Sequence, residues 1–269
     1  MKKLLLMIAA TLMAVSCAQD KTPKYLVLYY SQTNTTKAVA EELCKKLGAD
    51  IEEITPVNPY NGTYEETIAR CMRERESGEL PEVNPIAANL DDYDVIFFGY
   101  PIWFGTIALP AASALKNVDF SGKTVVPFCS FGSGGLEAGI KDLKAAQPKA
   151  NILDGYGVRA ARTDAIPAEV DRFLKEGGFI DGDYEEYEAF SAVRPASEAE
   201  VAIFNAAVGT YPMIQEKATN VASRPIPGGT EYLFDTNAPG IKIYVVAPMA
   251  RSPISQGLSD NLRRLSHND

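Results

Sequence analysis

The sequence predicts an α/β fold in which helices cover both faces of a parallel sheet. Short, almost wholly apolar strands alternate with amphipathic helices along the first two thirds of the chain. Strands of that composition are typical of a sheet buried on both faces, and their alternation with helices indicates parallel crossover connections. Five such strands within about 150 residues favour a doubly wound sheet of strand order 2-1-3-4-5.

The first strand and the first helix lie within residues 24–48. KYLVLYYS is a continuous apolar run that predicts a buried strand. In the helix that follows, TKAVAEELCKKLG, Val39, Leu43 and Leu47 recur every four residues and therefore share one face. Gly48 ends this pattern, which is typical of a helix C-terminus.

The next predicted helix begins at a capping box. DIEEITPV predicts a second, shorter strand, and the helix after it has Thr63 and Glu66 three residues apart and Gly78 at its end. The remaining predicted elements are a strand at 95–98, a helix at 107–117, a strand entering a glycine-rich turn at 123–135, a helix at 135–148, a strand at 151–159 and a helix at 167–178.

The chain changes character after Gly178. An acidic, irregular segment predicts a linker, and a helix, a hairpin around Pro-Gly-Gly and a third strand follow it, as in a small α+β domain. A C-terminal extension packed on the first domain is the alternative. The expected organisation is a signal peptide at 1–17, a linker at 18–24, the main domain at 25–178, a linker at 179–195 and the small α+β domain at 196–269.

The N-terminus resembles a secretory leader. Lys2 and Lys3 precede an apolar run that is too short to span a bilayer. The following AVSC resembles a bacterial lipoprotein cleavage box, although Ala14 stands where such boxes usually have leucine. The resemblance implies cleavage before Cys17, lipidation of its thiol and a place at the cell envelope outside the cytoplasm, at the periplasmic or outer-membrane face. A plain signal peptide is the alternative.

Charge and cysteine content exclude several functions. A net charge of -9 argues against nucleic acid as a partner and against docking on anionic lipid by charge, so the lipid anchor is the expected membrane contact. Cys44, Cys71 and Cys129 are odd in number and are expected to be buried thiols. The only histidine, His267, lies near the end of the chain, which argues against a histidine-dependent nucleophile. No Cys/His cluster predicts a metal site, and no residue is assigned as catalytic.

Three loops follow strands whose carboxyl ends share one edge of the predicted sheet, where such sheets bind ligands. SQTNTTK offers hydroxyls and helix N–H groups to an anion, with no basic residue before Lys37, as suits a permanently bound monophosphate. PIWFGT carries the only tryptophan, Trp103, which could stack on a flat ligand. SFGSGG lets bare backbone approach a ligand. Singly, each could be a capped helix start, a core cover or a flexible turn. Together they match the phosphate, ring and pyrimidine edge of flavin mononucleotide (FMN).

The runs YYSQTNTTKAVAEEL, VIFFGYPIWFGTIALP and FSGKTVVPFCSFGSGG resemble the flavodoxin family, especially its short-chain bacterial branch, over roughly Tyr25 to Gly178. The resemblance implies a flavodoxin-like fold and FMN as cofactor. Its motifs assign the phosphate to Ser31, Thr33, Asn34, Thr35 and Thr36, the ring to Pro101, Trp103, Phe104, Gly105 and Thr106, and the far side of the ring to Ser130, Phe131, Gly132 and Gly135. Asn34 stands where the family usually has glycine; asparagine tolerates a left-handed turn better than other non-glycine residues.

The expected function is electron transfer with a redox partner protein or a small quinone-like acceptor. Two alternatives stay open: an FMN-dependent NAD(P)H:quinone reductase, and a binding lipoprotein that keeps the scaffold without redox turnover. The C-terminal part is faintly similar to cystatin-like domains, on FNAAVG and VASRPIPGGTEYLFDTN. That similarity implies a protein-binding module and not protease inhibition, because RPIPGG departs from the inhibitory hairpin.

Overall fold

The computed structural model describes residues 23–132, 135–209, 215–226, 229–239 and 242–248. The predicted signal peptide, Cys17 and His267 lie outside these ranges. Within the described residues, no helix is long and apolar enough to cross a membrane.

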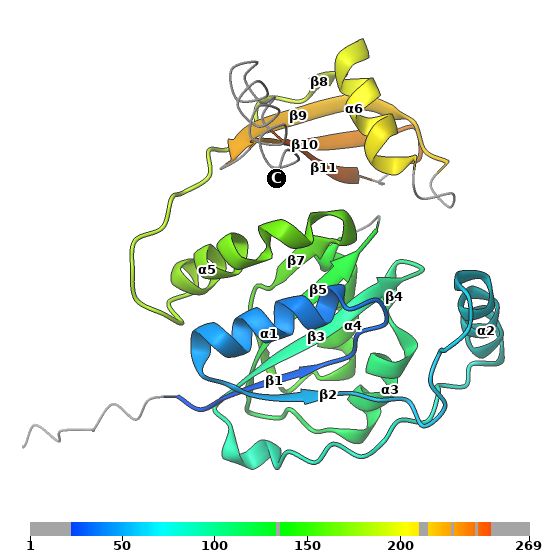
Figure 1. Ribbon diagram of the computed structural model, residues 1–269, viewed down its shortest axis with the longest axis vertical. Coiled ribbons are helices and arrows are strands. Elements are labelled where there is room, and N and C mark those ends of the chain that lie inside the picture. Colours follow the sequence, from blue (N-terminus) through cyan, green and yellow to red (C-terminus); the bar gives the residue numbers. More distant parts are fainter. Residues whose placement is uncertain (1–22, 133–134, 210–214, 227–228, 240–241, 249–269) are drawn as a thin grey trace, which may run out of the picture.

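A mostly parallel sheet forms the centre of the first unit (Figure 1). Its strand order is β2-β1-β3-β5-β6, with β7 also paired to β5, and these pairs are parallel. The strands are β1 (Tyr25–Tyr29), β2 (Asp50–Glu53), β3 (Val95–Trp103), β5 (Thr124–Phe131), β6 (Asn151–Ile152) and β7 (Tyr156–Arg159). The predicted order 2-1-3-4-5 is confirmed, and the predicted fifth strand is divided into β6 and β7. The division falls at Gly155, where a Cβ would lie 2.2 Å from the carbonyl oxygen of Pro127.

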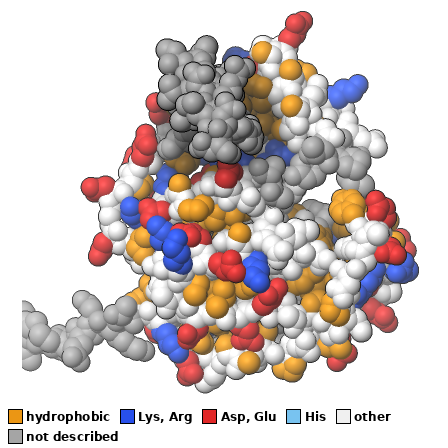
Figure 2. All heavy atoms as spheres, viewed as in Figure 1, with side chains coloured by type: hydrophobic (Ala, Val, Ile, Leu, Met, Phe, Trp, Pro, Cys, Tyr) orange, Lys and Arg blue, Asp and Glu red, His pale blue; other side chains and the backbone are white. Residues whose placement is uncertain are grey.

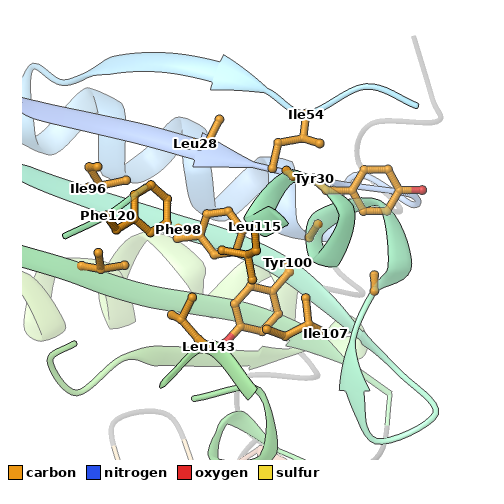
Figure 3. Packing of buried hydrophobic residues seen from close by; sticks show 14 of the residues in the cluster. Leu28, Tyr30, Ile54, Ile96, Phe98, Tyr100, Ile107, Leu115, Phe120 and Leu143 are labelled. Atoms are coloured by element: carbon orange, nitrogen blue, oxygen red, sulfur yellow. The ribbon is translucent and has the colours of Figure 1, made fainter. Parts of the chain in front are cut away.

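Two helices cover each face of this sheet (Figure 1). α1 and α5 pack on one face over Val27, Phe97 and Phe128, and α3 and α4 pack on the other over Phe98 and Tyr100. Adjacent residues of β3 thus enter opposite cores, because side chains alternate along a strand. The helices are α1 (Thr35–Leu47), α3 (Leu109–Asn117), α4 (Leu136–Ala146) and α5 (Ile166–Glu176), with short 3-10 helices at Leu90–Asp92 and Ala160–Ala165. Figure 3 shows the α3–α4 core.

The predicted helix boundaries are confirmed where the sequence carries capping signals. α1 ends at Gly48, which is left-handed with φ 62°. α2 (Tyr64–Ser77) begins with the predicted capping box of Thr63 and Glu66 and ends at the left-handed Gly78. Only Cys71 of α2 is buried, and the helix stands at the side of the first unit (Figure 1).

A separate antiparallel sheet and one helix follow, and the predicted fold class is confirmed in both parts. The sheet has the order β11-β10-β9-β8, and its side chains pack with Phe204 and Val208 of the helix. The elements are β8 (Arg194–Pro195), α6 (Glu198–Val208), β9 (Ala218–Ile226), β10 (Gly229–Thr236) and β11 (Lys242–Pro248). We refer to α6 and this sheet as the C-terminal unit. The proposed domain boundaries at 178 and 196 stay a prediction.

Candidate functional site

The three predicted loops lie at one edge of the sheet. β1, β3 and β5 are neighbouring parallel strands, so their carboxyl ends point to the same side. The first and third loops are also in direct contact, because the hydroxyl oxygens of Thr36 and Ser130 are 2.8 Å apart and hydrogen-bonded. Both side chains are buried, at 1% and 5% exposure. The fold therefore brings together the start of α1 and the glycine-rich turn after β5.

The first loop ends in a helix start whose N-cap residue gives no side-chain cap. Asn34 is the N-cap residue of α1, and it adopts a left-handed conformation (φ 64°, ψ -2°). Its side chain makes no capping hydrogen bond, and the first turn contains no acidic residue. Ser31 accepts a hydrogen bond from the N–H of Lys37 at 3.2 Å. The N–H groups of Thr35 and Thr36 and the positive end of the helix dipole suit an anion, with Thr33 and Asn34 exposed beside them.

The second loop is a tight hairpin that the sequence analysis did not predict. β4 (Thr106–Ile107) folds back on β3, with Trp103 paired to Thr106. Phe104 and Gly105 form the two-residue turn, and both have positive φ, 49° and 76°. Turns of this kind favour Asn-Gly, and phenylalanine in the first position is strained. The Phe104 side chain is 41% exposed, so burial does not compensate for the strain.

Trp103 packs against an aromatic wall, formed by Tyr30 and Tyr60, that the sequence analysis did not predict. Its ring makes edge-to-face contacts with Tyr30 and Tyr60, at centroid distances of 5.8 and 5.3 Å. The Arg70 guanidinium lies 3.8 Å from the centre of the Tyr60 ring, and the Tyr60 hydroxyl donates to Glu74 at 2.5 Å. Tyr60 belongs to the loop beyond β2, which is also a carboxyl end at this edge. That position in the sequence is the signal from which Tyr60 could have been assigned to the site.

Gln32 ties the two wall tyrosines together. The Tyr30 hydroxyl donates to Oε1 of Gln32 at 2.5 Å, and Nε2 of Gln32 donates to the Tyr60 carbonyl at 2.7 Å. Burial raises the pKa of the Tyr30 and Tyr60 phenols, and the Glu74 carboxylate raises both further. Both phenols are therefore neutral at physiological pH and act as hydrogen-bonding, apolar walls.

The other predicted site residues differ in their exposure and in the direction of their side chains. Gly132 and Gly135 are partly exposed, and a Cβ on Gly135 would meet no atom within 4 Å, so this edge is open. Residues 133–134 between them lie outside the described residues. Pro101 is buried within β3, opposite Ser130. The Thr106 hydroxyl donates to Asp142 of α4, so it is directed at that helix.

The arrangement joins a helix start, a half-buried indole and a glycine edge, which fits a phosphate-bearing flat ligand. A comparison with known protein families matches residues 24–171 to the family described as Flavodoxin, more than half of the 269-residue chain.

This chain belongs to the flavodoxin family. Membership supports FMN as the cofactor that the sequence predicts. We call the parallel sheet with its flanking helices the flavodoxin unit; the C-terminal unit lies beyond the matched residues.

Solved flavoprotein structures resemble the flavodoxin unit. A candidate flavoprotein from Bacteroides uniformis is 27% identical, with a TM-score of 0.50 over 56% of this chain and 99% of that one. Another from Bacteroides eggerthii is 31% identical, with a TM-score of 0.48 over 55% and 96%. A Lactobacillus acidophilus flavoprotein in complex with FMN is 21% identical, with a TM-score of 0.46 over 53% and 97%. No curated protein matches the sequence.

The flavodoxin unit offers no cluster for a metal ion in its described part. Groups of three or more histidine, cysteine, aspartate or glutamate side chains that could hold one are absent from the described residues of the chain. Cys129 is fully buried, and burial raises the pKa of its thiol.

Proposed function

We propose that this flavodoxin binds FMN and transfers electrons at the cell envelope, tethered by a lipid on Cys17. The observation that carries the redox part is the hydrogen bond between Thr36 and Ser130. It fixes the start of α1 against the glycine edge after β5, with the Trp103 hairpin on the strand between them. One ligand with a phosphate and a flat ring can contact all three loops.

The chain's own residues would bind and orient the cofactor. N–H groups at the start of α1 and the nearby hydroxyls would hold the phosphate without a metal, Trp103 and Phe104 would line the ring, and Gly132 and Gly135 would admit its far edge. FMN, when bound, supplies the electron-accepting ring. The net charge of -9 disfavours an anionic reduced ring and therefore lowers its reduction potential.

We expect the peptide around Gly105 to reorient, so that a backbone carbonyl oxygen would accept a hydrogen bond from the protonated ring nitrogen of reduced FMN. Gly105 has a φ of 76°, and a Cβ there would meet no atom within 4 Å, so a substitution acts through the backbone and not through a clash. In the FMN-loaded protein, Gly105→Val should shift the reduction potentials. Unchanged potentials would contradict this role.

FMN titration of the mature chain from Ala18 tests the proposal directly. Trp103 is the only tryptophan, so its fluorescence reports on the site. We expect saturable quenching and a yellow protein, and weaker binding of riboflavin, which lacks the phosphate. A colourless protein whose fluorescence does not change with FMN would favour a binding lipoprotein that keeps the scaffold without a cofactor. The additional C-terminal unit is an observation that favours this alternative.

The tether is tested separately. Cys17→Ser should move the protein from the membrane fraction to the soluble fraction without changing FMN binding. Membrane association that survives this change would contradict the lipid anchor.

A flavin enzyme is the second candidate, because Phe104 is 41% exposed beside the ring site and offers a flat contact to a small quinone-like acceptor. Steady oxidation of NADPH by the pure FMN-loaded protein with a quinone would favour this enzyme over a carrier. The carrier instead requires a partner protein to reduce it.

A further inference from the structure

The C-terminal sheet has two faces, and only one is covered by its own helix. Phe204 of α6 packs on Val221, Phe234 and Ile243. The other face carries Ala222, which follows Val221 along β9 and so points the opposite way. Ala222 is only 3% exposed, so this second face is covered as well.

The segment between the two units supplies part of that cover. Phe190 packs edge-to-face on Tyr244 of β11, at a centroid distance of 6.2 Å, and the Arg224 guanidinium lies 4.4 Å from the Phe190 ring centre. The N–H of Ser191 donates to the Ser223 carbonyl at 2.8 Å, and Ser223 N–H donates back to the Ser191 hydroxyl at 3.0 Å. The acidic segment predicted as a linker is therefore fastened along β9.

Tyr187 fastens the same segment to the flavodoxin unit. Its ring contacts two guanidinium groups: that of Arg172 of α5 is 3.7 Å from the ring centre, and that of Arg224 of β9 is 5.1 Å from it. Arg172 also donates to the Glu185 carbonyl at 2.9 Å. The clasp formed by Arg172, Tyr187 and Arg224 thus joins the two units through one aromatic ring.

A second contact reaches the candidate flavin site. Arg159 ends β7, is paired with Phe131 of β5, and is only 7% exposed. Its Nη1 donates to the Tyr244 carbonyl at 2.6 Å. Burial and the nearby Glu137 carboxylate in the first turn of α4 raise the pKa of Tyr244. β11 therefore contacts the end of β7, whose last residue is paired with Phe131 at the end of β5.

We infer that the face of the C-terminal sheet opposite α6 is a docking surface for the flavodoxin unit, and that docking holds the ends of β5 and β7 in the position that receives FMN. This inference rests on the proposed function. A buried guanidinium is costly without partners, so the chain end that carries Arg159 and the paired Phe131 is fixed most firmly while β11 is docked. By linkage, FMN binding and docking then favour each other.

The test uses the full mature chain and compares Arg159→Gln with wild type by amide hydrogen exchange, first without FMN. Faster exchange is expected in β11 and at the end of β5, because undocking frees both. The FMN dissociation constant should then rise about tenfold. Arg73→Gln is the matched control, since it removes the same charge from an exposed position on α2 and should change neither measurement.

A second variant distinguishes the loss of docking from local misfolding at the buried Arg159. Tyr187→Ala removes the clasp from outside both cores and should produce the same two effects in smaller measure. If exchange rises while FMN affinity is unchanged, or if neither variant raises exchange, the inference is wrong. If wild type does not bind FMN but both variants raise amide exchange in β5 and β11, the docking is supported and the proposed function is contradicted.

Discussion

The hydroxyl groups of Thr36 and Ser130 are hydrogen-bonded at 2.8 Å although the residues are 94 positions apart. Thr36 lies in the first turn of α1 and Ser130 near the end of β5. Both side chains are buried, so neither hydroxyl has water as a ready substitute partner. This bond is the physical link between the two loops that we expect to hold opposite ends of FMN.

Thr36→Val should lower the free energy of unfolding. Valine keeps the shape of threonine but leaves the Ser130 hydroxyl buried without its partner, which costs about 1–3 kcal/mol. Urea unfolding followed by circular dichroism measures the change. Thr33→Val, at an exposed position of the same loop, should cost less than 0.5 kcal/mol, within about the usual range for surface changes. The double variant Thr36→Val with Ser130→Ala should be less unstable than the sum of the single changes; full additivity would mean that the two hydroxyls are uncoupled.

The hairpin turn gives a prediction in which stability and binding move in opposite directions. Phe104→Asn places the favoured residue in the first position of a turn whose φ values are both positive. We expect the apo protein to gain about 1 kcal/mol, because a left-handed conformation costs other residues about that much. FMN binding should weaken, because an aromatic ring is lost from the site. Thermal unfolding and FMN titration of one preparation test both, and a gain in FMN affinity would rule out a ring-contacting role for Phe104.

The sequence was most informative where single residues dictate backbone geometry or burial. The elements and the strand order of the flavodoxin unit were predicted correctly from its apolar strands, the capping box at Thr63 and the helix end at Gly48. Asn34 was expected in a left-handed conformation and has it. Such features depend on neighbours in the chain, so a single sequence reveals them.

Features that depend on contacts between distant segments could not be predicted. The β4 hairpin is local, and it was missed for another reason: Phe104 is an unfavourable turn residue, so the usual turn signal is absent. Tyr60 and Arg70 join the Trp103 wall only through tertiary packing. The acidic segment 179–195 reads as a solvated linker, yet Tyr187 and Phe190 pack against arginines from both units. Its composition hides the aromatic contacts that position it.

The C-terminal unit should lose stability in acid. Arg194 binds the Glu200 carboxylate with two hydrogen bonds of 2.8 and 2.6 Å, and these bonds, with those from Ser197, lower the pKa of Glu200 to about 2. The folded pKa is below the ordinary value, so this stabilisation is complete above about pH 4.5 and is lost as the pH falls towards 2.

Glu200→Gln isolates that contribution. The variant should be less stable than wild type at pH 7, and the difference should shrink as the pH is lowered from 5 to about 2.5. Amide exchange in α6 and β9 is the measurement, because it reports on this unit alone. Glu198→Gln, which changes an exposed acid in the same first turn, is the control. A constant difference between Glu200→Gln and wild type over this pH range would contradict the assignment.

Tyr100 offers a substitution that should stabilise the protein. Its side chain is fully buried beside Ile107 and Leu143 (Figure 3), and its hydroxyl has no hydrogen-bond partner among the described residues. Burial raises the pKa of this phenol, so the group stays neutral. Removing an unpaired buried hydroxyl avoids its desolvation cost, so Tyr100→Phe should raise the free energy of unfolding by about 1 kcal/mol.

The matched control makes the same chemical change where the hydroxyl is bonded. Tyr30 is also buried, at 3% exposure, and its hydroxyl donates to Gln32 at 2.5 Å. Tyr30→Phe should therefore lower the free energy of unfolding by about 1 kcal/mol. Urea unfolding of both variants gives the comparison. Acidic and basic side chains are interspersed on the face that Figure 2 shows. Neither substitution alters charge, so the comparison can be made at one ionic strength. A loss of stability in Tyr100→Phe as large as that in Tyr30→Phe would mean that a water or other group satisfies the Tyr100 hydroxyl.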